Sequence, residues 1–308
     1  MKPPMPSQCY YWIASPFLED THYLQLKPEE YEQLYSARQT LADAGAFERR
    51  LALLIENFTE MEIFYARLSL NSFVGGKVSY SYASESISEA NRVLMNFLSS
   101  MQSYTDQVKS GFKKTSVGGT FKRIADVELN KVRSTSNSYA IASAIRNYAQ
   151  HVEAPIVRLE PMPKGQVAWA DRIFGSMESR EFSDYLRREK VKLDLTEHGS
   201  WINTRKLCYD SVRLLSQYHV HLRSIIDKDI STARSSVEQA LKELSAARPK
   251  SAQQKAVGKL AVIFTTESET DPLDSERITQ HTLTLAWDDV RLTHATTQAP
   301  IVDYKRSP

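Results

Sequence analysis

Three polar residues, Arg146, Asn147 and His151, lie close together in a segment whose pattern predicts a helix over residues 138–154. Histidine suits proton transfer near neutral pH, because its unperturbed pKa is about 6.5. Arginine stays charged and presents a planar set of donors that fits phosphate oxygens. Cleavage of RNA by internal transfer needs both functions: proton transfer at the 2′-OH and the 5′-oxygen, and stabilisation of a charged phosphorane. These residue types therefore indicate chemistry on a phosphate ester, in which Asn147 could orient His151 or hold a phosphate.

The predicted helix over 138–154 carries an apolar stripe that decides where these polar side chains point. At about 100° per residue, the stripe spans roughly 60° of the helix surface. Its members are Ile141, Ile145, Tyr148 and Val152. His151 and Asn147 are i,i+4 neighbours on one flank of the stripe, and Arg146 projects from the other flank. All three leave the core face, so a cleft formed with another surface could collect them. The alternative is an exposed helix end, where the helix dipole favours a histidine.

The run Arg146-Asn147-x3-His151 resembles the Arg-x4–6-His signature of the HEPN superfamily (higher eukaryotes and prokaryotes nucleotide-binding), whose arginine is often followed by Asn, Asp or His. The resemblance implies a helical bundle and a metal-independent endoribonuclease without a cofactor. It implies that Arg146 binds phosphate as the electrophile, that His151 is the general acid–base and that Asn147 supports them. It also implies a homodimer with two Arg–His pairs in one cleft and single-stranded RNA as substrate. The setting would be a toxin–antitoxin or phage-defence system, with a nucleotidyltransferase-like antitoxin as partner.

Two other functions stay open at this stage. The same bundle could be a catalytically inactive interaction or scaffold protein, or a HEPN module that binds nucleotides without cleaving RNA. Arg213 and His219 form a second pair with a permitted spacing, but Arg213 is followed by Leu214 rather than by a polar residue. We therefore treat Arg213 and His219 as a decoy. We also expect no metal site, because His219 and His221 lie on different faces of a helix and no carboxylate completes a ligand set.

A basic run precedes the predicted helix and offers candidates for binding the RNA backbone. The candidates are Lys113, Lys114, Lys122 and Arg123, within a run that also includes Lys109, Lys131 and Arg133. A solvated helical face is the commoner explanation of such a run. Gly118-Gly119 could cradle a phosphate before a helix, but a plain turn is the commoner use of two glycines.

Composition narrows the class of protein. The chain has 308 residues, of which 42% are hydrophobic and 25% charged, and these are globular averages. The formal net charge of +2 does not indicate nonspecific nucleic-acid binding, so any electrostatic footprint must be local. Cys9 and Cys208 form no short-spaced pair, which argues against a zinc ribbon or a disulfide scaffold. The absence of an apolar run of about 18 residues and of a signal-like start predicts a cytoplasmic protein outside the membrane.

The periodicity predicts a mainly α fold: a HEPN-like multi-helix bundle with a small C-terminal appendage that contains one or two short strands. We expect an N-terminal arm over 1–27, a helical domain over 28–247 and a tail over 248–308. Pro28 should start a helix that breaks near Gly45. The further helices are expected at 46–71, 86–110, 121–132, 138–154 and 200–247, the last capped by Ser200.

The predicted helices over 46–71 and 86–110 carry near-heptad apolar stripes and should pair antiparallel. Their buried residues should include Leu54, Phe58, Phe97 and Met101. Residues 155–195 look irregular apart from a possible helix at 177–188. Strands are expected at 259–266 and 282–287, where β-branched residues alternate.

Overall fold

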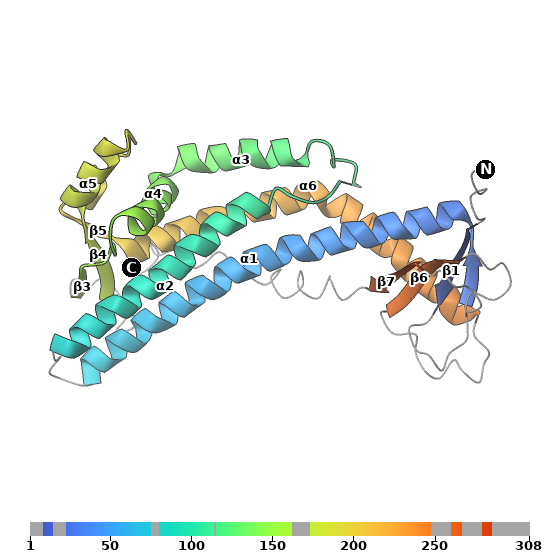
Figure 1. The fold of residues 1–308 in the computed structure, drawn as a ribbon, viewed down its shortest axis with the longest axis horizontal. Helices are drawn as coiled ribbons and strands as arrows, with labels where there is room; N and C mark the ends of the chain where they lie inside the picture. The colour runs from blue at the N-terminus through green and yellow to red at the C-terminus, as the bar shows by residue number, and fades with distance from the viewer. Residues whose placement is uncertain are drawn as a thin grey trace, which may run out of the picture. The chain divides into compact units, whose positions relative to one another are not determined.

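The computed structural model describes residues 9–14, 23–74, 80–113, 115–161, 173–247, 260–266 and 279–284. Within these residues the fold is mainly α, as the periodicity predicts, with two small sheets (Figure 1). The helices are α1 (Pro28–Val74), α2 (Tyr80–Gln107), α3 (Phe121–Thr135), α4 (Asn137–His151), α5 (Ser179–Arg188) and α6 (Thr204–Ala246). None of the described helices is long and apolar enough to cross a membrane.

The chain divides into two compact units that share the two longest helices. The first unit comprises residues 1–48, 111–121 and 223–296, and the second comprises 49–110, 122–222 and 297–308. These boundaries differ from the arm, helical domain and tail predicted from the sequence. The reason is that one strand of the predicted arm, residues 10–14, pairs with one strand of the predicted tail, residues 260–266.

The first unit contains an antiparallel sheet of order β2-β1-β6-β7. Its strands are β1 (Tyr10–Ala14), β2 (Tyr23–Leu26), β6 (Leu260–Thr266) and β7 (Thr279–Thr284). The indole N–H of Trp12 in β1 donates to the Thr266 hydroxyl in β6 over 3.2 Å. The expectation of an irregular arm was therefore wrong, because the partner strands lie far away in the sequence. The predicted strands of the tail are confirmed at β6 and, in part, at β7, and residues 285–287 lie outside the described residues.

Helix α1 is continuous from Pro28 to Val74, so the predicted break near Gly45 is wrong. A glycine inside a helix costs only about 1 kcal/mol relative to alanine, and tertiary packing readily offsets that cost. Gly45 is itself buried, between the buried residues Ala44 and Phe47.

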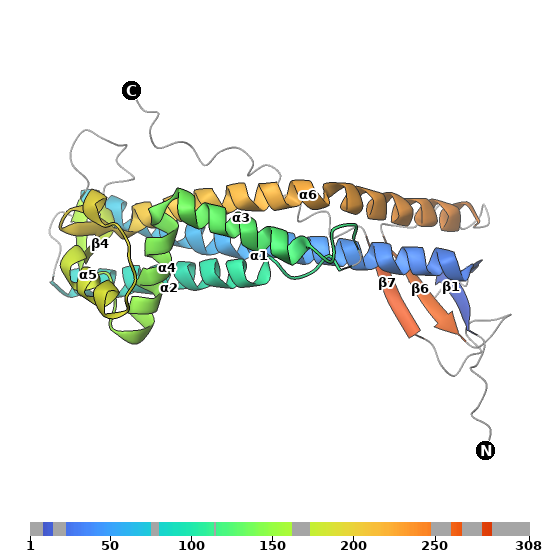
Figure 2. The same ribbon diagram turned by 90° about the horizontal axis from the view of Figure 1, so that it is seen from above.

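In the second unit, α2 runs back alongside the part of α1 that belongs to this unit (Figures 1 and 2). The predicted core is confirmed, since Leu54, Phe58, Phe97 and Met101 are all buried. The rings of Phe58 and Phe97 meet edge to face, with their centroids 5.9 Å apart. The antiparallel pairing of two amphipathic helices thus follows from their stripes.

A second antiparallel sheet, of order β3-β4-β5, lies in the region predicted to be irregular. Its strands are β3 (Arg158–Pro161), β4 (Ile173–Glu178) and β5 (Trp201–Asn203). The possible helix at 177–188 is present as α5. Helix α6 begins at Thr204 rather than at Ser200, and Asn203 provides its cap by accepting from the Lys206 N–H over 3.0 Å.

Candidate functional site

Helix α4 positions Arg146, Asn147 and His151. Its start is capped by the Ser136 hydroxyl, which accepts from the Ser138 N–H, and its last residue is His151. The buried face comprises Tyr139, Ile141, Ala142, Ile145 and Tyr148. Val152, predicted to continue this face, is 48% exposed, because the backbone leaves the helical conformation at that residue. The helix end therefore carries His151 at the surface.

Tyr148 anchors the last turn of α4. Its ring packs edge to face against Phe182 and Tyr185 of α5, at centroid distances of 5.9 and 5.3 Å. Its hydroxyl donates to the Glu153 carboxylate over 2.6 Å. Burial and the adjacent Glu153 carboxylate raise the pKa of Tyr148 well above its ordinary value, so the hydroxyl remains a donor. This packing fixes the backbone on which Arg146 and His151 are mounted.

The structure brings Arg146 and Asn147 together. Arg146 is half-buried, and its Nη1 donates to Asn147 Oδ1 over 3.3 Å. Arg146 Nε is buried without a hydrogen-bond partner among the described residues. Asn147 thus orients the arginine rather than His151.

His151 stands apart from this pair. It is exposed, and within the described part of the chain no hydrogen bond or ion pair joins it to Arg146 or Asn147. The arrangement provides a half-buried cation on one flank of α4 and an accessible imidazole at the helix end. One chain therefore supplies the parts for phosphate binding and proton transfer without joining them.

The decoy pair has a structural role for its histidine. His219 is fully buried in α6, and its Nδ1 shares a hydrogen bond with the Tyr104 hydroxyl over 3.1 Å. Arg213 is exposed on the same helix. A buried ring bonded to a tyrosine is a core histidine, so this pair is not a candidate site.

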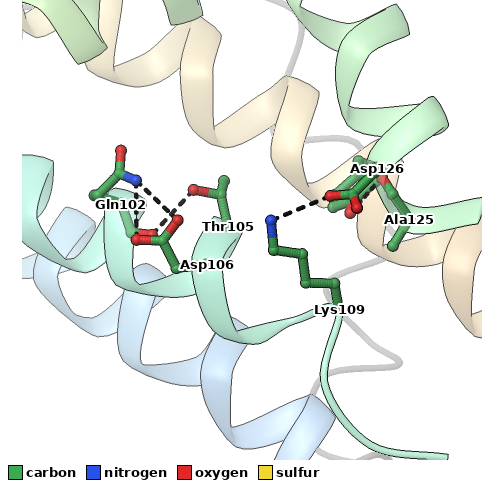
Figure 3. Close-up of polar contacts among 7 residues, drawn as sticks. Gln102, Thr105, Asp106, Lys109, Ala125 and Asp126 are labelled. Atoms are coloured by element: carbon green, nitrogen blue, oxygen red, sulfur yellow. Dashed lines mark hydrogen bonds and ion pairs between the residues drawn. The ribbon is translucent and has the colours of Figure 1, made fainter. Parts of the chain in front are cut away.

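The basic run is partly neutralised by neighbouring groups. Lys109 forms an ion pair with Asp126 over 3.1 Å (Figure 3), and Lys131 forms one with Glu128. Of the four predicted RNA-binding residues, Lys114 lies outside the described residues. Lys113 is exposed in the first unit, and Lys122 and Arg123 are exposed at the start of α3 in the second unit.

Gly118 lies in a tight turn. A Cβ at Gly118 would lie 2.5 Å from the Lys113 carbonyl oxygen, so the turn requires a glycine. This contact gives Gly118 a structural explanation, whereas a Cβ at Gly119 would meet nothing within 4 Å. Among the described residues, no three His, Cys, Asp or Glu side chains form a group that could hold a metal ion.

A groove on α5 and the segment that follows it was missed by the sequence analysis. It has a volume of about 1110 Å³, and its lining includes four cationic side chains. The cations are Arg180, Arg187, Lys190 and Lys192. Arg180 and Arg187 lie in the helix predicted at 177–188. Lys190 and Lys192 lie in the part predicted to be irregular, so the sequence alone could not place the four cations on one surface.

Comparisons of the chain with protein-family models, with curated proteins and with solved structures found no match. The functional interpretation therefore rests on the residues of α4 and their surroundings.

Proposed function

We propose that this protein is a metal-independent endoribonuclease of HEPN type that acts on single-stranded RNA. The observation that carries the proposal is the last turn of α4, which holds an accessible His151 and a half-buried Arg146 oriented by Asn147. In this reaction Arg146 binds the scissile phosphate and stabilises the charge that develops on its oxygens. His151 transfers the proton at the 2′-OH or at the 5′-oxygen.

A single Arg–His pair supplies one acid–base group, whereas the reaction moves two protons. We propose that a second copy of the chain supplies the other histidine across a twofold axis. The exposed apolar side chains of Val152 and Val157, each 48% exposed beside the end of α4, suit such a contact. This arrangement also gives a use to the His151 imidazole, which forms no hydrogen bond or ion pair with Arg146 or Asn147 within the described residues.

The biological setting belongs to the same proposal. A cytoplasmic ribonuclease of this type would need restraint in its own cell, which is the role of a nucleotidyltransferase-like antitoxin in a toxin–antitoxin or phage-defence system. A non-catalytic scaffold is the alternative, and it is favoured by the lack of a hydrogen bond between His151 and Arg146 within the described chain.

Incubation of the protein with single-stranded RNA in EDTA tests the activity. We expect fragments that end in 2′,3′-cyclic phosphate, because the nucleophile is the substrate's own 2′-OH. DNA of the same sequence should remain intact, since it lacks that hydroxyl. Intact RNA after prolonged incubation, both alone and after separation from any co-purified partner, would favour the scaffold.

A further inference from the structure

The groove on α5 is formed entirely within the second unit, by α5, residues 189–195 and the short helix η2 (Thr196–His198) with its flanks. Its cationic side chains are all exposed, so they are available to a ligand. Arg187 lies 3.2 Å from Asp184 but is 79% exposed. Arg180, Lys190 and Lys192 form no ion pair within the described residues.

Two carboxylates line the same groove, Glu178 and Asp194. Asp194 is engaged by its own loop, because its Oδ1 accepts from the Thr196 N–H over 2.9 Å and from the Thr196 hydroxyl over 2.7 Å. Among the lining residues, four cations therefore outnumber two carboxylates, although Arg187 is paired with Asp184 and the whole chain is nearly balanced. A local excess of this kind favours an anionic ligand.

The start of α5 adds a second feature that suits an anion. Glu178 precedes the helix and provides no side-chain cap. The Ser179 N–H donates to the Ser200 carbonyl over 3.1 Å, so only the N–H groups that follow it in the first turn can face an anion. Ser179, the first helical residue, lines the groove and is only 7% exposed. Its hydroxyl has no hydrogen-bond partner among the described residues. A phosphate oxygen at this point would meet the helix start, whereas the Ser179 hydroxyl has less than 1 Å² of accessible surface and is covered.

Lys190 occupies an unusual backbone conformation at the other end of α5. Its φ of 57° lies in the left-handed region, which favours glycine. The Val191 N–H donates to the Leu186 carbonyl over 2.9 Å, as in a common helix-ending motif. A lysine at this position is less stable than a glycine would be, but it places an ammonium group at the groove.

We propose that this groove binds the phosphate backbone of single-stranded RNA. The choice of RNA as the polyanion rests on the proposed function, whereas the preference for a phosphate ligand rests on the groove itself. The cations contact successive phosphates, and apolar residues such as Leu186 and Leu193 line the groove beneath the sugars. Because α5 packs against Tyr148, this site is mounted on the same layer as the end of α4.

The test measures binding of a fluorescein-labelled single-stranded RNA by anisotropy, using the full chain with His151→Ala so that the RNA stays intact. The groove variant is Arg180→Ala/Lys192→Ala. The matched control, Arg213→Ala/Lys242→Ala, removes the same residue types from exposed positions on α6. We expect the groove variant to raise Kd at least tenfold and the control to change it less than twofold. Since each neutralised phosphate of a single strand contributes about 0.7 to the slope of log K against log salt, the slope should fall by about 1.4.

Lys190→Gly separates binding from folding. Glycine relieves the left-handed strain, so this variant should raise Tm while weakening RNA binding. Equal Kd values for the groove variant and its control, or Lys190→Gly that binds as tightly as its parent, would overturn the groove.

The two proposals can fail separately. If RNA binding depends on the groove but the wild-type chain does not cleave RNA, the nuclease proposal fails and the groove proposal stands. If the wild-type chain cleaves RNA and Arg180→Ala/Lys192→Ala leaves the KM unchanged, the proposal that the groove binds RNA fails and the nuclease proposal stands.

Discussion

At the scale of single residues, Asn147 lies beside Arg146 and accepts a hydrogen bond from its guanidinium. A hydrogen bond of this kind contributes about 0.5–1.5 kcal/mol net. Its loss would let the arginine sample orientations that do not face the phosphate. The role of Asn147 in the proposed site is thus positional.

Replacing Asn147 with alanine should lower the rate of RNA cleavage by roughly two- to twelvefold, which is the kinetic equivalent of that hydrogen bond. Single-turnover cleavage rates measure the effect. Asn130→Ala, on the exposed face of α3, is the control and should cleave at the wild-type rate. A loss of a thousandfold or more for Asn147→Ala would instead mean that Asn147 contacts the reacting phosphate.

At the scale of elements, the apolar stripes of α1 and α2 hold the second unit together. Phe97 is fully buried and packs against Phe58. Truncation of such a ring removes its burial and leaves a cavity, at a cost of roughly 3–5 kcal/mol.

We therefore expect Phe97→Ala to lower the free energy of unfolding by roughly 3–5 kcal/mol, measured by urea denaturation. Asn96→Ala, at the adjacent exposed position of α2, should stay within about 0.5 kcal/mol of wild type. Similar losses for both variants would show that the stripe is not the core of this unit.

The helices could be predicted from the sequence because their stability comes from local stripes that the spacing reveals. The same spacing placed Arg146, Asn147 and His151 on a surface-facing part of α4. It could not show that Asn147 faces Arg146, since a choice between two neighbours depends on rotamers rather than on period. It likewise placed Val152 in the core, because a stripe does not reveal where the helix ends.

Strands β6 and β7 were predicted from alternating β-branched residues, whereas the strands before them were harder to predict, for a physical reason. β1 pairs with β6 across most of the chain, and β3, β4 and β5 are each only a few residues long. Short strands owe their stability to partners distant in sequence, so no local pattern marks them. The groove on α5 was missed for a different reason: its four cations are close in sequence, but they come partly from α5 and partly from the segment after it, whose path the sequence did not reveal.

At the scale of the whole molecule, the proposed reaction requires two chains. We expect sedimentation equilibrium at micromolar concentrations to give twice the chain mass. Val152→Asp should weaken this association, since it places a charge at the proposed contact beside His151.

The control for that variant is Val220→Asp, at a comparably exposed valine on α6. It should leave the dimer and the cleavage rate unchanged. A monomeric mass up to high micromolar concentration, in a preparation that still cleaves RNA, would contradict the composite site.

The central claim is that Arg146 and His151 perform the chemistry, and one comparison tests it most directly. Cleavage of single-stranded RNA in EDTA should fall by about 10²–10⁴-fold in His151→Ala, as expected for a general acid–base group, and Arg146→Ala should also abolish most of the activity. Arg213→Ala, from the decoy pair, should cleave at the wild-type rate. The Tm of His151→Ala should match that of wild type, because His151 is exposed at a helix end. A folded His151→Ala variant that cleaves RNA as fast as wild type would contradict the account.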